Sequence, residues 1–354
     1  MLGRCRIIGQ LVLVLVGAAG VSQAAETGRR VILLDGTWQI AQGTKDRIPE
    51  AFHRTVPVPG LVDLAQPPFR LVGFEEGNKI REAFWYRRTF QIDGPVPDVA
   101  VLKINKAKYG TRVYLNGQLV GDHLPCFTPA VLDVRKYLLG NGRPNELIIR
   151  VGAYRTSVPR TIPDGWDFEK YRYIPGIYDS VQLILSGTPH VVRVQTVPDI
   201  EHGQVRVVAE IANAGAAKDV KVRFRVYEAV GGRLMGDAES SVVRIGAGVA
   251  KTIDTTVPIR NCRLWSPSDP FLYRLEVSTG ADTLSTRFGM RTFRFDPKTR
   301  RAILNGKPYP LRGTNVCVYR FFEDDARGDL PWRKDWVRGL HQKFRSMHWE
   351  AIRY

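Results

Sequence analysis

The apolar side chains of this chain follow one spacing before residue 295 and another spacing after it. Residues 204–211 and 220–227 alternate apolar and polar side chains, which is the period of a half-buried strand. From residue 333 onward the apolar side chains recur with helical spacing and fall on one stripe: Trp336, Val337, Leu340, Phe344 and Met347. This change of period restricts the chain to a long β part followed by the opening of an α/β part.

The β part divides into two at Thr188-Pro189-His190. Residues 31–185 carry short strands separated by turn residues, including an Asn116-Gly117 hairpin turn, and this pattern predicts a sandwich or jelly roll over residues 26–187. Residues 188–294 carry roughly seven strands in about a hundred residues, a spacing typical of an immunoglobulin-like sandwich. We therefore expect a mainly β protein with two β-sandwich domains.

Residues 295–354 read as strands around an Asn305-Gly306 turn, then a helix over residues 333–347, then a last short strand. Strand, helix, strand is the opening of a parallel α/β domain. No later element of the chain covers this helix, so we expect its apolar stripe to be exposed to water. We also expect this domain to be incomplete.

The first 25 residues have the order of a secretory signal. Arg4 and Arg6 precede the apolar residues 7–21, and small side chains follow at Ser22 and Ala24. The run is shorter than the ~20 apolar residues that a membrane span needs. The chain is therefore expected to be secreted or periplasmic, without a membrane span.

The net charge of +17 raises the question of a nucleic-acid partner. A nucleic-acid-binding protein gathers its Lys and Arg side chains in a patch with aromatic residues. Here Lys221, Arg223 and Arg225 alternate along a predicted strand, as on a solvated sheet face. We expect no nucleic-acid partner, and an acidic polysaccharide remains the alternative explanation of the charge.

Three cysteines lie beyond the predicted signal: Cys126, Cys262 and Cys317. They are far apart and odd in number, which argues against a disulfide framework and against a metal site. Each is expected to be a small buried side chain. The sequence predicts no metal and no cofactor.

A long irregular stretch between two predicted strands, residues 152–179, carries the candidate sugar-binding residues Trp166, Asp167 and Glu169. An aromatic face stacks on the apolar face of a sugar ring, and carboxylates accept hydrogen bonds from hydroxyls. The alternative is that the aromatic residues of this loop pack in a small local core.

Several segments, taken together and in this order, carry a family resemblance: residues 34–38, 85–90, 113–121, 175–181, 264–267 with 270–273, 288–291, and 304–308 with 311–315. Their sequences are LDGTW, WYRRTF, VYLNGQLVG, PGIYDSV, LWSP with PFLY, FGMR, and LNGKP with LRGTN. The chain resembles glycoside hydrolase family 2, the β-galactosidase, β-glucuronidase and β-mannosidase group. The resemblance covers essentially all of the chain after the predicted signal.

This resemblance implies a jelly-roll sugar-binding domain, an immunoglobulin-like domain and a (β/α)8 barrel that begins at residue 295. It also implies retaining hydrolysis of a β-glycosidic bond by two glutamates ~5 to 5.5 Å apart. In the family these glutamates end the fourth and seventh barrel strands. Residues 295–354 correspond to only the first strand, helix and second strand, so we expect no catalytic residue here and no activity from this chain alone.

The resemblance also carries over two substrate-binding residues. Arg353 matches the arginine of the family's Asn-Ala-Val-Arg segment, although Glu350 stands where that segment has Asn. Asn315 matches the asparagine that closes the first barrel strand, whereas Cys317 is the nearest residue to a family histidine. The intervening carboxylates are expected to be solvated, with Asp329 capping a helix: Glu323, Asp324, Asp325 and Asp329.

The alternative function is that of a non-catalytic secreted carbohydrate-binding protein, in which the two β-sandwich domains form the functional unit. The sequence does not identify the sugar or the linkage, and it leaves an oligomer open. In both readings the expected partner is a carbohydrate, as a β-glycoside substrate or as a ligand.

Overall fold

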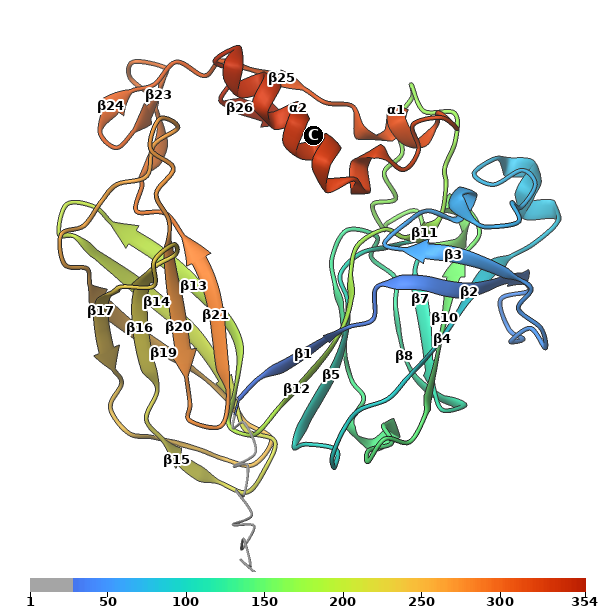
Figure 1. Ribbon diagram of the computed structural model, residues 1–354, viewed down its shortest axis with the longest axis horizontal. Helices are drawn as coiled ribbons and strands as arrows, with labels where there is room; N and C mark the ends of the chain where they lie inside the picture. The colour runs from blue at the N-terminus through green and yellow to red at the C-terminus, as the bar shows by residue number, and fades with distance from the viewer. Residues whose placement is uncertain (1–27) are drawn as a thin grey trace, which may run out of the picture.

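A computed structural model describes residues 28–354 and consists mainly of β-strands, which confirms the predicted class. The predicted signal, residues 1–25, lies outside the described residues. Two β bodies stand side by side, and a C-terminal segment spans their upper ends (Figure 1). Of the helices within residues 28–354, none has the length and apolar character that a membrane crossing requires.

The first β body, residues 30–186, contains two sheets that share one buried core. One sheet has, in spatial order, β1 (Arg30–Leu33), β12 (Val181–Ser186), β5 (Val99–Ile104) and β9 (Ala130–Asp133). The other has β3 (Arg54–Val58), β2 (Gly36–Gly43), β4 (Ala83–Phe90), β10 (Asn145–Gly152), β7 (Thr111–Leu115) and β8 (Gln118–His123). A small ladder pairs β6 (Ala107–Lys108) with β11 (Gly176–Ile177).

Short 3-10 helices complete this body: η1 (Val62–Leu64), η2 (Glu75–Lys79), η3 (Arg135–Tyr137) and η4 (Arg155–Ser157). The turn at Asn116 and Gly117 has φ angles of 52° and 77°, as a tight hairpin on this dipeptide requires. It joins β7 to β8, so the predicted hairpin is confirmed.

Strand β4 is buried on both faces near its start, because three consecutive aromatic side chains there point to alternate faces of the sheet. Phe84 and Tyr86 belong to the main core, whereas Trp85 belongs to a second cluster that includes Phe52 and Ile148. A strand that buries both faces fixes its register strongly, since a shift of one residue exchanges the two sets.

The second β body, residues 190–288, has its own buried core. One of its sheets contains β13 (His190–Asp199), β14 (Gln204–Ala212) and β19 (Ala250–Pro258). Another contains β17 (Leu234–Glu239), β16 (Arg223–Glu228), β20 (Tyr273–Ser278) and β21 (Thr283–Phe288). A third pairs β15 (Lys218–Val220) with β18 (Val243–Ile245).

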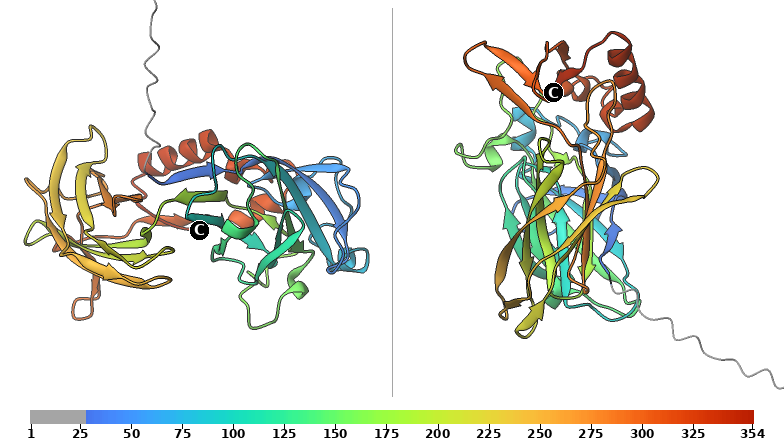
Figure 2. Two further views of the ribbon diagram at one scale, coloured as in Figure 1. Left: turned by 90° about the horizontal axis from the view of Figure 1, so that it is seen from below. Right: turned by 90° about the vertical axis from the view of Figure 1, so that its left-hand side faces the viewer.

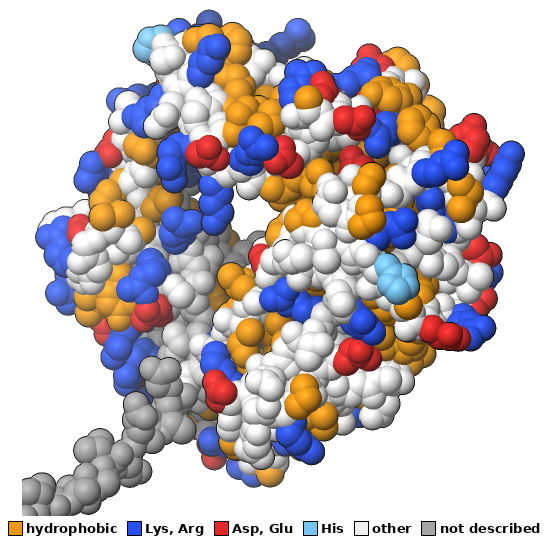
Figure 3. All heavy atoms as spheres, turned by 45° about the vertical axis from the view of Figure 1, so that its right-hand side comes forward, with side chains coloured by type: hydrophobic (Ala, Val, Ile, Leu, Met, Phe, Trp, Pro, Cys, Tyr) orange, Lys and Arg blue, Asp and Glu red, His pale blue; other side chains and the backbone are white. Residues whose placement is uncertain are grey.

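The basic residues of the second body lie on a solvated face, as the sequence predicts. Lys221, Arg223 and Arg225 are exposed and alternate with buried neighbours. Glu239 pairs with both Lys221 and Arg223, and the Arg223 contact measures 2.9 Å. In Figure 3, Lys and Arg side chains are scattered over the visible face with acidic side chains among them.

A buried ion pair ties the start of the first body to the second body. Asp282, in the turn between β20 and β21, is fully buried and accepts hydrogen bonds from Arg29 Nε at 3.0 Å and Nη2 at 2.7 Å. The backbone N–H of Val191 donates to the same carboxylate at 2.7 Å. Asp282 therefore connects the two bodies, because its carboxylate accepts hydrogen bonds from both Arg29 and Val191.

The C-terminal segment, residues 293–354, runs from the second body to the first. It begins with an antiparallel sheet of β22 (Phe293–Asp296), β23 (Arg301–Leu304) and β24 (Lys307–Pro308). It continues with β25 (Gly313–Asn315), α1 (Val318–Phe322), η5 (Leu330–Trp332), α2 (Lys334–Ser346) and β26 (Ala351–Arg353). Figure 2 shows this segment crossing between the bodies, and Figure 3 shows an opening that remains between them.

The apolar stripe of α2 is less exposed than the sequence analysis expected. Phe344 is only 8% exposed and lies 5.7 Å from the Trp349 ring, between centroids. Trp336 meets Phe321 at 5.1 Å. The expectation of a fully open stripe is wrong because α1 and the turn after α2 supply aromatic partners, although Met347 stays exposed.

Two local expectations also fail in this segment. Cys317 is exposed, whereas Cys126 is buried as expected. Asp329 precedes η5 but makes no side-chain capping bond, because its carboxylate pairs with Arg333 at 2.7 Å instead.

Candidate functional site

The structure brings together the two residues expected to bind substrate in the C-terminal segment. Strands β25 and β26 are parallel, and Asn315 and Arg353 are partners at their carboxyl ends. The Val316 N–H donates to the Arg353 carbonyl at 2.8 Å and extends this pairing by one residue. Both side chains line an open surface depression of about 330 Å³.

The long loop of the first body, residues 153–175, docks against residues 316–333, and we call this contact the junction. Its centre is Glu323, which is 6% exposed. Glu323 Oε1 accepts hydrogen bonds from the backbone N–H groups of Tyr171 and Arg172, each at 3.2 Å. The Tyr171 hydroxyl donates to the Glu323 carbonyl at 2.8 Å. The expectation that Glu323 is solvated is therefore wrong, because the loop folds over it.

Glu169 also belongs to the junction. Its Oε2 accepts hydrogen bonds from the Tyr319 hydroxyl at 3.1 Å and from Arg320 Nη2 at 3.3 Å. One of its carboxylate oxygens is thus already used within the protein. The predicted contact of Glu169 with a sugar stays a prediction, and its observed contacts position α1.

A tryptophan closes the other end of the junction. Trp332 Nε1 donates to the Tyr178 carbonyl at 3.0 Å. Its ring stacks on Phe322 with centroids 5.1 Å apart and 29° between the planes. Both side chains pack against the core of the first body, so the junction is apolar at this end.

The remaining predicted residues of the loop lie differently. Trp166 is 59% exposed. Asp167 Oδ1 accepts from the Glu169 N–H at 2.9 Å, and the Asp167 carbonyl accepts from the Tyr173 hydroxyl at 3.1 Å. Tyr173 is buried in a small cluster with Tyr154, so part of the loop forms the local core that was the alternative explanation.

A small cavity lies between the loop and α1, and we call it the lysine pocket. Its volume is about 150 Å³. Its basic side chains come from β6 and from the loop, and its aromatic side chains come from the first body and from α1. Its lining residues include Lys108, Phe127, Lys170, Arg172, Tyr319 and Phe322.

The carboxylates around Arg172 lie in contrasting environments. Arg172 Nη1 lies 3.0 Å from Asp325 Oδ1, which is exposed, and Nη2 lies 3.8 Å from Asp63 Oδ2. Burial raises the pKa of Asp63 to about 6, and the nearby Arg172 guanidinium only partly opposes this. Asp63 does not line the lysine pocket, so the raised pKa concerns stability at the junction.

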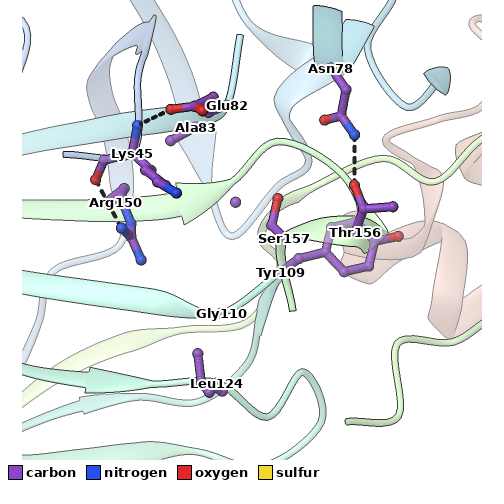
Figure 4. A pocket seen from close by; sticks show the side chains of 11 residues that line it. Lys45, Asn78, Glu82, Ala83, Tyr109, Gly110, Leu124, Arg150, Thr156 and Ser157 are labelled. Carbon is purple, nitrogen blue, oxygen red and sulfur yellow. Dashed lines mark hydrogen bonds between the residues drawn. The ribbon is translucent and has the colours of Figure 1, made fainter. Parts of the chain in front are cut away.

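A second cavity, of about 370 Å³, lies in the first body (Figure 4). Figure 4 shows Lys45, Glu82 and Arg150 on one side and Asn78, Thr156 and Ser157 on the other. Its polar groups already bond one another, as in the contact from Asn78 Nδ2 to Thr156 Oγ1 at 2.7 Å. The sequence analysis named none of these residues.

Within residues 28–354 there is no cluster of three or more His, Cys, Asp or Glu side chains suited to a metal ion. Lys108 and Arg172 line the lysine pocket, but the sequence does not mark either of them as a candidate. Lys108 reaches the loop because β6 pairs with β11, where Lys108 is opposite Gly176. Strands β6 and β11 have only two residues each, which is too short for a periodic pattern, so the sequence does not predict their pairing.

Comparison with known proteins finds one family to which the chain is similar. The profile described as Glycosyl hydrolases family 2 matches residues 190–291. The chain is 26% identical over 292 residues to a β-galactosidase of Thermoanaerobacter pseudethanolicus, covering 77% of this chain and 38% of that protein. These matches support membership of the chain in glycosyl hydrolases family 2. A putative β-glucuronidase of Formosa agariphila is 26% identical over 264 residues, which cover 72% of this chain and 30% of that protein.

Solved structures share the fold of this chain. A putative β-galactosidase from Bacteroides fragilis superposes with a TM-score of 0.64 at 19% identity, covering 82% of this chain and 45% of that one. A β-glucuronidase from Bacteroides uniformis gives 0.63 at 19% identity, covering 84% and 38%. The chain therefore spans less than half the length of these proteins.

Proposed function

We propose that this family 2 protein is a retaining β-glycosidase of the β-galactosidase type. Family membership carries the proposal, and relatives named β-galactosidase support the choice of sugar. A β-glucuronide is the second candidate substrate, since another relative is named as a putative β-glucuronidase.

We further infer the arrangement of domains that this function would use. Residues 26–187 would be the jelly-roll sugar-binding domain, residues 188–294 the immunoglobulin-like domain, and residues 295–354 the start of the catalytic barrel. The separate cores of the two β bodies support the first two assignments. The parallel pairing of β25 with β26 across a helix supports the third.

Within this arrangement Arg353 and Asn315 bind the substrate. They are partners at the carboxyl ends of two parallel strands, and barrel enzymes place their substrate-binding groups at that end. Trp166 is the candidate for stacking on a sugar ring, since its ring is exposed. Asp167 and Glu169 remain weaker candidates because each already accepts hydrogen bonds from the protein.

We propose that residues 28–354 do not catalyse hydrolysis by themselves. Retaining hydrolysis needs two carboxyl groups facing one bond, ~5 to 5.5 Å apart. The four carboxylates within residues 323–329 instead pair with arginines. These pairs are Glu323 with Arg320, Asp324 with Arg327, Asp325 with Arg172, and Asp329 with Arg333. Secretion into the periplasm or the medium stays part of the proposal, on the order of residues 1–25.

The test assays the 354-residue chain, beside any longer product of its reading frame, on aryl β-galactoside, β-glucuronide and β-mannoside. The anomer of the first product is identified by NMR. We expect the 354-residue chain to give no turnover, and any product that hydrolyses a substrate to release the β-anomer first. Release of the α-anomer would contradict retention, and turnover abolished by Glu323→Gln in the chain would contradict our assignment of that residue.

A carbohydrate-binding role without hydrolysis is the competing outcome. It predicts glycan binding by the 354-residue chain, with no turnover by any product of the reading frame. Trp166→Ala should then weaken glycan binding, while Phe168→Ala, a change at an exposed aromatic residue of the same loop, provides the matched control.

A further inference from the structure

A groove of about 910 Å³ lies between helix α2 and the first β body, and we call it the α2 groove. Its volume is at the upper end of the range of ligand sites in proteins. One wall is α2, and the other is formed by β1, by the turn after β3 and by the turn before β12. The groove shares no lining residue with the lysine pocket or with the depression beside Asn315 and Arg353.

The α2 wall of the groove is basic. Its ionisable side chains follow one another at spacings of four, three and four residues, which is one face of a helix: Lys334, Arg338, His341 and Arg345. All four are exposed. At 1.5 Å per residue this row is about 17 Å long. Trp336 and Phe344 lie outside the groove and meet other aromatic rings, so the basic face is distinct from the apolar stripe of α2.

The charges on this face have no partner within the described part of the chain. No carboxylate described by the structure lies within ion-pair distance of Lys334, Arg338 or Arg345. The arginines of the preceding segment differ, because each contacts a carboxylate: Arg320, Arg327 and Arg333. Three cations on one helix face are therefore available to an acidic ligand.

The one carboxylate that lines the groove belongs to Asp35, and the first body already uses it. Asp35 Oδ2 accepts a hydrogen bond from the Ser180 hydroxyl at 2.8 Å, and Oδ1 accepts from the Val181 N–H at 2.9 Å. Asp35 therefore holds β12 in place and does not neutralise the basic face of α2.

The rest of the first-body wall, and the end of the groove at η5, are apolar. The side chains are those of Leu33, Pro59, Pro331 and Trp332. Leu33 is 59% exposed. The groove thus has a basic wall facing an apolar one.

An extended peptide can satisfy both walls at once. Successive side chains of a strand point to opposite faces, and neighbours on one face are about 6.7 Å apart. The basic residues of α2 succeed one another at rises of about 4.5 to 6 Å, a difference that long, flexible side chains can absorb. Acidic side chains at alternate positions would face α2, and the intervening apolar side chains would face Leu33 and Pro59.

A polyanion fits this groove less well. Nucleic acids and sulfated polysaccharides carry charge along their whole backbone, so they would leave the apolar wall in contact with water. Stacking on bases would need free aromatic rings. The Trp332 ring already stacks on Phe322.

This chain offers no acidic segment of its own for the groove. Its net charge of +17 makes a second copy repulsive overall. Residues 1–27 contain one acidic side chain, Glu26. The carboxylates within residues 323–329 are paired with arginines. The ligand is therefore expected to come from a different protein.

We propose that the α2 groove binds an extended segment of another protein in which acidic and apolar side chains alternate. The acidic side chains would pair with Lys334, Arg338 and Arg345. Because these pairs are exposed, each contributes little, and the binding should be of about micromolar strength and sensitive to salt. The proposed hydrolysis does not use this groove, so the two proposals stand or fall separately.

The test measures the fluorescence anisotropy of labelled peptides titrated with the 354-residue chain. The probe is a capped peptide of about eight residues that alternates Glu and Val. A peptide of the same composition, with the Glu and Val residues in two blocks, keeps the charge but cannot present it on one face. We expect the alternating peptide to bind about fivefold or more tightly than the block peptide, and added salt to weaken the binding. Equal binding of the two peptides would overturn the proposal.

The first variants remove charge from the groove. Arg338→Gln and Arg345→Gln should each weaken binding of the alternating peptide about threefold, and together about tenfold. Gln is nearly as good a helix former as Arg, so α2 should stay folded. Lys343→Gln is the matched control, since Lys343 is exposed on the same helix but outside the groove. An equal loss in Lys343→Gln would mean non-specific attraction and would overturn the proposal.

A second pair of variants tests the apolar wall. Leu33→Thr should weaken binding of the alternating peptide about threefold. Val31→Thr is its control, because Val31 is 46% exposed on the same strand but does not line the groove. Unchanged affinity in Leu33→Thr would contradict the alternation of the ligand. Thermal unfolding of each variant checks that the fold is retained.

Heparin is titrated in parallel as the alternative ligand. We expect its binding to change less than that of the alternating peptide in the double variant of Arg338 and Arg345. A larger loss for heparin than for the peptide would assign the groove to a polysaccharide and overturn the proposal.

Discussion

The Oε1 atom of Glu323 lies 3.2 Å from the backbone nitrogen of Tyr171, a residue 152 positions earlier in the chain. The Glu323 side chain is only 2% exposed, so the C-terminal segment is held to the first β body through a buried carboxylate. Its two backbone partners are N–H groups that the loop itself leaves free. The docking of α1 and the conformation of the loop should therefore depend on each other.

The first prediction concerns this contact. Glu323→Ala leaves the Tyr171 and Arg172 N–H groups without their acceptor, and should lower the free energy of unfolding by about 2–4 kcal/mol. Hydrogen exchange of residues 163–175 should become faster. Urea denaturation and exchange measured by mass spectrometry check both effects.

Asp325→Ala is the matched control for Glu323→Ala. Asp325 contacts the same Arg172, but its side chain is 93% exposed, so its loss should cost less than about 1 kcal/mol. Equal effects of the two substitutions would mean that the buried carboxylate does not hold the junction.

The second prediction concerns the buried pair between the bodies. Asp282→Ala leaves the Arg29 guanidinium and the Val191 N–H without their acceptor, and should cost about 3–5 kcal/mol. Asp254→Ala removes an exposed carboxylate that pairs with Arg206, and should cost less than about 1 kcal/mol. Chemical denaturation of both variants measures the difference, and a small effect of Asp282→Ala would contradict the assigned role.

The third prediction is a pH dependence at Asp63, whose pKa burial raises from 3.8 to about 6. The folded state keeps this proton where the unfolded state has lost it, so stability falls as the pH rises from about 4 through about 6. The full loss is up to roughly 3 kcal/mol. Asp63→Asn removes the titrating group, and its stability relative to the parent should increase over the same interval.

Denaturant unfolding at several pH values between about 4 and 7 checks this prediction. Asp98→Asn is the control, since Asp98 is 58% exposed in its side chain and lies 3.8 Å from Arg135. A stability difference between Asp63→Asn and the parent that stays constant with pH would contradict the raised pKa of Asp63.

The strands could be predicted because their signals are local. The alternation of residues 204–211 corresponds to β14, which is Gln204–Ala212. The alternation of residues 220–227 corresponds to β16, which begins later, at Arg223, and ends at Glu228. The Asn305-Gly306 turn has φ angles of 50° and 79°, which Asn and Gly adopt readily. In such segments a few neighbouring residues determine the backbone.

The site could be predicted only in part, because its contacts join distant residues. Asn315 and Arg353 are candidates because they match family segments, and the ladder of β25 and β26 pairs them. Glu323 is expected to be solvated because it lies in the loop after the first predicted barrel strand. Nothing near it in the sequence indicates that Tyr171 and Arg172 cover it. Lys108 lies in a strand of two residues, which has no period to detect.

The last prediction tests the pairing that places Asn315 beside Arg353. A Cβ atom on Gly313 would lie 1.8 Å from the Ala351 carbonyl oxygen and 2.7 Å from its carbon, so Gly313→Ala must move β25 away from β26. We expect faster hydrogen exchange at Val316 and at residues 351–353, together with lower stability. Gly339→Ala is the matched control, because its Cβ would meet open space and it lies within α2. That control should stabilise the helix by about 1 kcal/mol. If Gly313→Ala left exchange at Val316 unchanged, the close parallel pairing of β25 and β26 would be wrong, and with it the shared position of Asn315 and Arg353.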